Sequence, residues 1–131
     1  MSRSYEFLKE CGVFFVLTMN GDHPAGRPFG AIMEHEGTLY FSTATMKDVY
    51  KQLIHNPKIQ ILALKHGTRD WIRINGFAVE CHDIAIKQKM LEECPVLTKH
   101  FDSAVCAYYA VFEVSDKEAL LNLNNEFLYV D

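Results

Sequence analysis

The fold is decided by one stretch, residues 38–57, which reads TLYFSTATMKDVYKQLIHNP. Its first part alternates apolar and polar residues and is rich in β-formers, a pattern that predicts a strand. In its second part Val49, Leu53 and Ile54 recur at helical spacing, and Asn56-Pro57 is typical of a helix end. We therefore expect a strand that runs directly into a helix.

The junction between this strand and this helix carries hydroxyl groups and a cation, namely Ser42, Thr43, Thr45 and Lys47. The first turn of a helix leaves backbone N–H groups unpaired, and such groups bind anions. Hydroxyl groups and a lysine beside them are the chemistry of a phosphate site. The simpler interpretation is that Thr45 caps the helix and Lys47 is solvated.

The composition is that of an ordinary globular protein. The chain has 131 residues, of which 49% are hydrophobic and 23% are charged, which predicts one domain over residues 1–131 with one core. The net charge of −4 predicts no general attraction to nucleic acid. The first residues lack the apolar core of a signal peptide and no apolar run is long enough to span a membrane, so we expect a cytoplasmic protein.

The cysteines and histidines show no pattern for a metal site. The four cysteines are widely spaced and are expected to be reduced thiols. Cys81, His82 and Asp83 are adjacent, and adjacent side chains of a strand point to opposite faces, so they cannot share one metal ion.

The rest of the chain is predicted to form strands and two further helices. Ser2 caps a first helix that Gly12 stops, and Asp83 caps a helix that ends before Pro95, with a short turn after it at 96–101. Strands are predicted at 13–19, 27–34, 38–43, 58–64, 70–81, 108–114 and 119–123. Gly76 lies within the longest strand, where a bulge would let a barrel close. The apolar tail 127–130 is expected to be buried.

Short strands at regular spacing, with one helix after the third strand and another before the last, favour a mainly β (α+β) fold. We expect a six- to seven-stranded antiparallel β-barrel with peripheral helices, because a barrel leaves no unpaired edge strand. A twisted open sheet packed on helices has the same spacing and is the alternative.

Several short motifs follow one another in a characteristic order. They are YEFLKECG at 5–12, GD at 21–22, RPFG at 27–30, LYFST at 39–43 with Lys47, VYKQ at 49–52, NP at 56–57 and WIRING at 71–76. In this order they resemble the pyridoxamine 5'-phosphate oxidase-like flavoproteins, which have an FMN-binding split-barrel fold, and within them the nitroimidazole-resistance reductases. The resemblance covers about residues 4–93 and fades after Pro95.

The resemblance implies that FMN is the cofactor and that ten residues bind it. The segment at 27–30 is implied to run along the flavin, Ser42, Thr43 and Lys47 to bind its phosphate, and Trp71 to contact its ring, often from a partner subunit. The implied residues are Arg27, Pro28, Phe29, Gly30, Ser42, Thr43, Lys47, Lys51, Trp71 and Arg73.

Other roles remain open for three of these residues. Lys51 is one helical turn from Lys47 and can equally be solvated. Trp71 can serve core or dimer packing instead of ligand binding. Arg73 can pair with Glu80 or Asp70 across a strand.

The resemblance also implies a homodimer with FMN at the subunit interface. Nine phenylalanines, six tyrosines and one tryptophan are many for a narrow barrel, which is compatible with a partner that covers some of them.

The resemblance implies an FMN-dependent oxidoreductase that reduces nitro or other small-molecule substrates with electrons derived from NAD(P)H. The flavin carries the chemistry, so no catalytic side chain is predicted. The alternatives are a non-enzymatic FMN-binding or electron-carrier module, and a split barrel that binds deazaflavin or haem. Oxidation of pyridoxamine phosphate is disfavoured, because the C-terminal region lacks the basic and aromatic substrate-binding segment of the true oxidases.

Overall fold

The computed structural model describes all 131 residues. In chain order its elements are α1 (Arg3–Cys11), β1 (Phe14–Asn20), β2 (His23–Phe29), β3 (Met33–His35), β4 (Thr38–Ala44), α2 (Asp48–His55), β5 (Lys58–Leu64), β6 (Trp71–Cys81), α3 (Ile84–Glu93), the 3₁₀ helix η1 (Pro95–Lys99), β7 (Tyr109–Leu123) and β8 (Glu126–Val130). The predicted strand that runs into a helix is therefore confirmed as β4 and α2. No helix is both long enough and apolar enough to cross a membrane.

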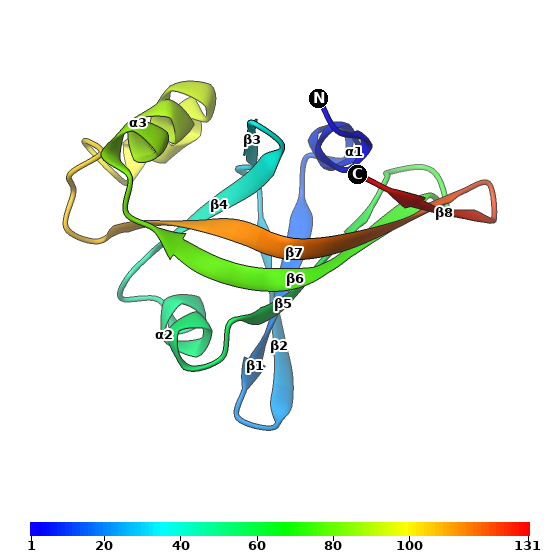
Figure 1. The fold of residues 1–131 in the computed structure, drawn as a ribbon, viewed down its shortest axis with the longest axis horizontal. Helices are drawn as coiled ribbons and strands as arrows, with labels where there is room; N and C mark the ends of the chain where they lie inside the picture. The colour runs from blue at the N-terminus through cyan, green and yellow to red at the C-terminus, as the bar shows by residue number, and fades with distance from the viewer.

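All eight strands form one antiparallel sheet. Its order is β2-β1-β5-β6-β7-β4-β3, and β8 pairs with β7 beyond the end of β4. The long strands β6 and β7 curve side by side across the middle of the molecule, with α1 and α3 on one side of them and α2 on the other (Figure 1). The sheet thus bends around a single interior.

The sheet closes through side chains instead of through a last row of hydrogen bonds. Phe29 of β2 packs edge to face on Phe41 of β4, with ring centroids 5.6 Å apart, although the two strands do not pair. Phe14 and Phe112 extend this row, at 6.1 Å from Phe29 and 5.7 Å from Phe41. Aromatic pairs at such distances are favourable contacts. The molecule is a barrel split between β2 and β4, which confirms the predicted fold class.

The predicted bulge at Gly76 is confirmed. The register of β6 against β7 shifts between Asn75 and Phe77. A Cβ atom at Gly76 would lie 2.9 Å from the carbonyl oxygen of Ser115 and 3.0 Å from Cγ1 of Val114. Since no real side chain fits at these distances, only glycine lets β6 bend this close to β7.

The predicted strand at 27–34 is wrong in its bounds. Its residues belong to two strands, because β2 begins at His23 and ends at Phe29, and β3 begins at Met33. Pro24 and Pro28 are tolerated since β2 is an edge strand, whose free side needs no N–H donor. This division and the short β8 add two strands. The separate strands predicted at 108–114 and 119–123 are wrong, because both segments belong to the single long strand β7, so the sheet has eight strands.

The tail is not buried as expected. It forms β8, and the side chains of Phe127 and Tyr129 are 65% and 73% exposed. Tail residues pair with β7 through their backbone and leave most of their apolar surface uncovered.

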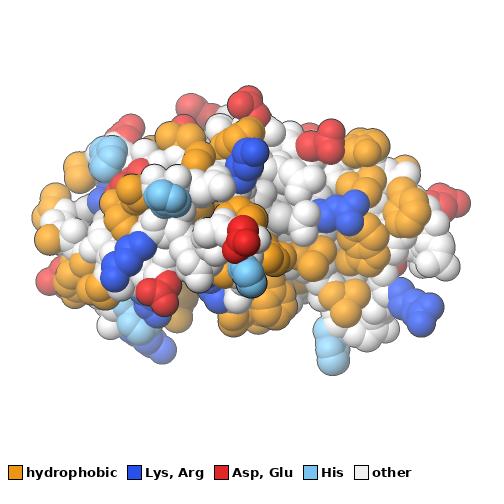
Figure 2. Space-filling view, turned by 90° about the horizontal axis from the view of Figure 1, so that it is seen from below, with side chains coloured by type: hydrophobic (Ala, Val, Ile, Leu, Met, Phe, Trp, Pro, Cys, Tyr) orange, Lys and Arg blue, Asp and Glu red, His pale blue; other side chains and the backbone are white.

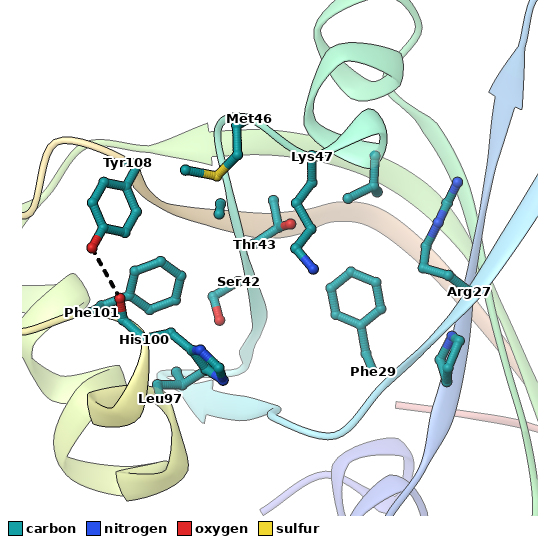
Figure 3. A pocket seen from close by; sticks show the side chains of 13 residues that line it. Arg27, Phe29, Ser42, Thr43, Met46, Lys47, Leu97, His100, Phe101 and Tyr108 are labelled. Carbon is teal, nitrogen blue, oxygen red and sulfur yellow. Dashed lines mark hydrogen bonds between the residues drawn. The ribbon is translucent and has the colours of Figure 1, made fainter.

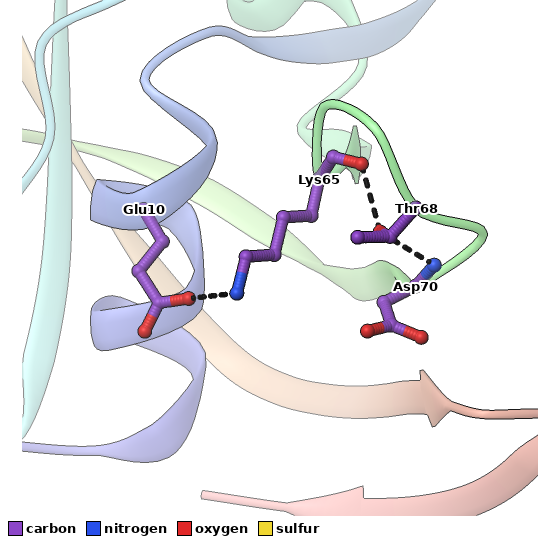
Figure 4. Close-up of polar contacts among 4 residues, drawn as sticks. All are labelled: Glu10, Lys65, Thr68 and Asp70. Carbon is purple, nitrogen blue, oxygen red and sulfur yellow. Dashed lines mark hydrogen bonds and ion pairs between the residues drawn. The ribbon is translucent and has the colours of Figure 1, made fainter.

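The helix α1 begins and ends as predicted. The hydroxyl of Ser2 accepts from the backbone N–H of Tyr5 at 3.2 Å, and Gly12 is the C-cap with a φ of 78°. Near its end, Glu10 pairs with Lys65 of the β5–β6 turn at 3.0 Å (Figure 4). This hydrogen bond raises the pKa of Lys65, but an exposed pair of this kind contributes little to stability.

The buried apolar residues form two clusters, so the expectation of one core is wrong. The first fills the barrel, and the second holds α3 and η1 against the outer face of β4 and β7. The second cluster consists of Met33, Tyr40, Ala44, Met90, Leu91, Cys94, Leu97, Phe101, Ala104, Tyr109 and Val111. Lys87 and Tyr109 connect α3 to β7 through two hydrogen bonds. Nζ of Lys87 donates to the carbonyl of Tyr109 at 2.9 Å, and the hydroxyl of Tyr109 donates to the carbonyl of Lys87 at 3.0 Å. Burial raises the pKa of this tyrosine. The cluster fixes η1 beside β4.

Candidate functional site

A pocket of about 430 Å³ opens where β2, β4, the start of α2 and η1 meet (Figure 3). It is lined by Arg27, Pro28, Phe29, Ser42, Thr43, Ala44, Met46, Lys47, Val49, Leu97, His100, Phe101 and Tyr108. The junction that the sequence singled out therefore forms one wall, and the split between β2 and β4 forms the opening beside it.

Six of the ten predicted site residues line this pocket, and four do not. Gly30 follows the end of β2, and Lys51 is an exposed residue of α2 outside the lining. Trp71 and Arg73 line a different hollow of about 370 Å³ on the outer face of β1, β5 and β6. The structure thus brings together the residues expected at the phosphate and along the ring, and separates the two expected from the later strand.

Arg73 does not form the ion pair that was its alternative role. Its Cζ atom lies 5.3 Å from the centroid of the Trp71 ring. Glu80 instead accepts from the Tyr50 hydroxyl at 2.8 Å, and Asp70 accepts from the backbone N–H of Asn124 at 3.0 Å. Arg73 and Trp71 therefore act as a stacked pair on the outer face.

Ser42 lines the pocket and carries a hydroxyl group that has no hydrogen-bond partner. The residue is 7% exposed, and its Oγ atom is buried without a hydrogen-bond partner. A buried polar atom that lacks a partner costs about 1–3 kcal/mol, so native proteins rarely keep one without a reason. The position of this atom in the lining of a pocket points to a ligand that completes its hydrogen bonding.

Lys47 supplies a cation beside this hydroxyl. Figure 3 shows its ammonium group directed into the pocket, between Ser42 and Phe29. Lys47 is also the N-cap residue of α2, and no side chain caps this helix. The interpretation that Thr45 caps α2 is therefore wrong, because the chain makes one more turn after β4 before the helix begins. The first N–H groups of α2 have no side-chain acceptor and remain available to an anion.

Arg27 brings a second positive charge, and the protein holds it tightly. Its guanidinium donates to Val16, Thr18 and Gln52 at 2.8–3.1 Å. Burial lowers the pKa of Arg27, while Asp48 acts in the opposite direction. No Asp or Glu lines the pocket, so its charge is positive.

The wall opposite Arg27 is apolar and aromatic, and sequence reasoning missed it. Leu97, His100 and Phe101 come from η1 and the residue pair that follows, and Tyr108 donates from its hydroxyl to the carbonyl of His100 at 3.3 Å. Tyr108 reaches the pocket because its carbonyl accepts from the backbone N–H of Thr45 at 3.0 Å. A short turn was predicted at 96–101, but nothing local in the sequence indicates which strand it covers.

The arrangement suits a ligand with an anionic end and a flat apolar part. Lys47, the hydroxyl of Ser42 and the start of α2 can bind oxyanions. Phe29, Phe101 and Tyr108 present aromatic surface to the remainder. The unpartnered Ser42 oxygen and the absence of carboxylates fit the phosphate of a flavin mononucleotide.

Comparison with known proteins decides the family. The family model described as pyridoxamine 5'-phosphate oxidase matches residues 3–120. The chain belongs to this family. The suspected resemblance is therefore confirmed, and the match extends past Pro95, where the motifs faded. A search of curated proteins returned no match.

Several solved structures are similar in fold to this chain. A NimC/NimA family protein from Clostridium acetobutylicum is 36% identical, with a TM-score of 0.90, over 97% of this chain and 88% of that protein. General Stress Protein 26 from Bacillus anthracis is 17% identical, with a TM-score of 0.77, over 95% of this chain and 94% of that one. A heme binding protein from Mycobacterium smegmatis is 11% identical, with a TM-score of 0.75, over 92% and 52%. The last two share the fold alone.

Proposed function

We propose that this protein is an FMN-dependent oxidoreductase that reduces small-molecule acceptors, nitro compounds among them, with electrons from NAD(P)H. The observation that carries the proposal is the buried hydroxyl of Ser42, which has no partner and lies beside Lys47 in the pocket. Membership of the pyridoxamine 5'-phosphate oxidase family supports a flavin as the ligand. The similarity to a NimC/NimA family protein supports nitro compounds as acceptors.

The residues of the pocket divide into two roles toward FMN. Ser42, Thr43 and Lys47, with the first turn of α2, would bind the phosphate, and Lys51 would add charge from the same helix. The end of β2, from Arg27 through Gly30, would run along the flavin. Bound FMN would supply hydride transfer between the reductant and the acceptor. The chain's own contribution is to bind, to orient and to provide positive charge, and no side chain is proposed as an acid or base.

We further propose that the protein works as a homodimer. The outer face of β1, β5 and β6, with β8 beside it, exposes large apolar side chains, among them Phe15 (46%), Leu64 (60%) and Phe127 (65%). Figure 2 shows hydrophobic side chains at several places on the face seen from below, some of them on the half of the molecule that carries β8 in Figure 1. A face of this kind is typical of a surface that a partner covers. A second copy would bring Trp71, with Arg73 beside it, to the flavin of the other subunit. Contact from a partner subunit is what the family resemblance implies for Trp71.

We place the protein in the cytoplasm. All four cysteines are free thiols, which fits a reducing compartment. NAD(P)H is the reductant expected there.

The function is tested by turnover of the FMN-loaded protein. We expect oxidation of NADH or NADPH, followed by absorbance, to be faster with a nitroimidazole than without it, and faster than with the same amount of free FMN. Lys47→Ala should lower this rate at subsaturating FMN, because it removes a charge that binds the phosphate. A rate equal to that of free FMN would contradict the reductase and leave a flavin carrier.

A haem or deazaflavin protein is the second candidate. His100 lines the pocket, and a histidine is the side chain that most often ligates haem iron. An absorbance spectrum of the purified protein separates the candidates, because haem gives a Soret band and FMN gives flavin bands. If the purified protein shows a Soret band and His100→Ala does not, the cofactor is haem and not FMN.

A further inference from the structure

The guanidinium of Arg27 is held in place by neighbours from two other elements. Its Nη1 atom donates to the carbonyl of Val16 at 3.1 Å and to Oγ1 of Thr18 at 2.8 Å. Its Nη2 atom donates to Oε1 of Gln52 at 2.8 Å. The Thr18 hydroxyl donates to the same Gln52 oxygen at 2.5 Å. The cluster thus ties β1, β2 and α2 together at one end of the pocket.

These contacts leave one edge of the guanidinium free. An arginine has five N–H donors in a fixed plane. The oxygens of Thr18 and Gln52 are hydrogen-bonded to each other, so they occupy the edge between Nη1 and Nη2, while Val16 takes the second donor of Nη1. The Nε–H group and the second donor of Nη2 remain. They form the edge that binds two oxygens of one phosphate side by side.

None of the groups that hold Arg27 carries a charge. Val16 offers a carbonyl, Thr18 a hydroxyl and Gln52 an amide oxygen, and Arg27 forms no ion pair. Thr18 is 2% exposed, so water does not compete for its hydroxyl. The carboxylate of Asp48 acts to raise the pKa of Arg27 but forms no ion pair with it, so the positive charge stays available to a ligand.

We propose that Gln52, together with Thr18, is a positioning residue that holds Arg27 so that its free edge binds a phosphate group in the pocket. The inference rests on the proposed function only for the ligand that carries this phosphate, which is FMN. A glutamate at position 52 could accept the same hydrogen bonds, but its carboxylate would neutralise Arg27. Glutamine provides the acceptor without the charge.

The first test compares FMN with riboflavin, which lacks the phosphate. We expect Gln52→Glu to weaken FMN binding at least about tenfold, because neutralised Arg27 would lose its charged hydrogen bond to the phosphate, which is worth about 1.5–3 kcal/mol. Riboflavin binding should change much less. Gln88→Glu, at an exposed position of α3 outside the pocket lining, adds the same charge and should bind both flavins as the unmodified protein does. Equal weakening of FMN and riboflavin by Gln52→Glu would overturn the proposal.

The second test is a double-mutant cycle of Gln52→Met and Arg27→Met, with FMN affinity as the readout. If Gln52 acts through Arg27, Gln52→Met weakens binding in the unmodified protein and changes nothing further in the Arg27→Met background. Additive losses would show that Gln52 acts independently and would overturn the proposal.

The third test needs no flavin, so it separates the inference from the proposed function. In ¹⁵N-labelled protein the Nε–H signal of Arg27, assigned by its absence in Arg27→Met, should shift when inorganic phosphate is added. The shift should be lost in Gln52→Glu and retained in Gln88→Glu. If the protein does not bind FMN but shows this pattern, the positioning role of Gln52 stands and FMN as the cofactor is wrong. A signal that phosphate does not move, or moves equally in Gln52→Glu, overturns the positioning role.

Discussion

The hydroxyl of Ser42 is unusual because it is buried and unpaired in the lining of a pocket. In the protein without ligand this oxygen lowers stability, since it has lost water and gained no partner. With an oxyanion in the pocket the same hydroxyl would donate a hydrogen bond to it, and the hydroxyl would then stabilise the complex instead of destabilising the protein. A residue that is unfavourable for folding and favourable for binding is typical of a functional site.

Ser42→Ala should therefore separate stability from affinity. We expect the free energy of unfolding of the ligand-free protein to stay the same or rise by up to about 1 kcal/mol, and FMN to bind about tenfold more weakly. Urea denaturation and flavin fluorescence titration measure the two quantities.

Ser4→Ala is the matched control for this substitution. Ser4 is fully buried, but its hydroxyl has a partner, Oγ of Ser2, at 3.3 Å. Its loss should lower stability and leave FMN binding unchanged. If Ser42→Ala is less stable and binds FMN normally, Ser42 contributes only to the core and not to ligand binding.

At the scale of elements, the bend of β6 against β7 sets the shape of the barrel. The bulge at Gly76 lets β6 follow β7 along its whole length, so that β4 can pair with one end of β7 and β8 with the other. Pairing with β4 then places Tyr108 and η1 beside the start of α2. The pocket thus depends on strand geometry far from its own residues.

Gly76→Ala should destabilise the protein by about 1–3 kcal/mol, because its Cβ would overlap the backbone of β7. The free energy of unfolding in urea measures this cost. Gly26→Ala on β2 is the control, since its Cβ would meet Leu17 Cγ at an ordinary 3.4 Å and should change stability by less than about 0.5 kcal/mol. Equal effects of the two substitutions would contradict the close approach at Gly76.

At the scale of the whole molecule, the exposed outer face is the feature that a single copy does not explain. Phe127 packs against Trp71, with ring centroids 6.0 Å apart, yet is 65% exposed. The hollow lined by Phe15, Leu64 and Trp71 continues this surface. Apolar area of this extent is favourable only when it is covered.

We expect Leu64→Glu to convert the proposed dimer into a monomer, because it places a charge on the face that a second copy is proposed to cover. Sedimentation velocity at micromolar concentration would show the change in mass. Ile54→Glu is the control, since Ile54 is also 60% exposed but lies on α2, and it should leave the dimer intact. An unmodified protein that sediments as a monomer would contradict the homodimer.

Local signals in the sequence predicted local structure well. The caps at Ser2, Gly12 and Asp83 and the bulge at Gly76 were predictable, because each follows from one residue and its neighbours. The junction between β4 and α2 was predictable for the same reason, and it supplies Ser42 and Lys47.

Contacts between distant segments could not be predicted in the same way. His100 and Tyr108 line the pocket only because β4 pairs with β7 and a hydrophobic cluster holds η1 in place. Trp71 and Arg73 lie on the outer face because they alternate with the buried Ile72 and Ile74, but the strand order decides which residues are their neighbours there. Gln52 contacts Arg27 through packing of α2 on β1. None of these pairings leaves a trace in the local spacing of residues.

We propose that the junction of β4 and α2 binds the phosphate of FMN. The most direct test is the absorbance spectrum of the purified protein before and after incubation with excess FMN and desalting, for the unmodified chain, Lys47→Ala and the surface control Lys58→Ala. We predict that the unmodified protein and Lys58→Ala retain roughly one flavin per chain, as one pocket allows, and that Lys47→Ala retains much less. Failure to retain FMN at low salt, with Lys47→Ala indistinguishable from the unmodified protein, would contradict the account.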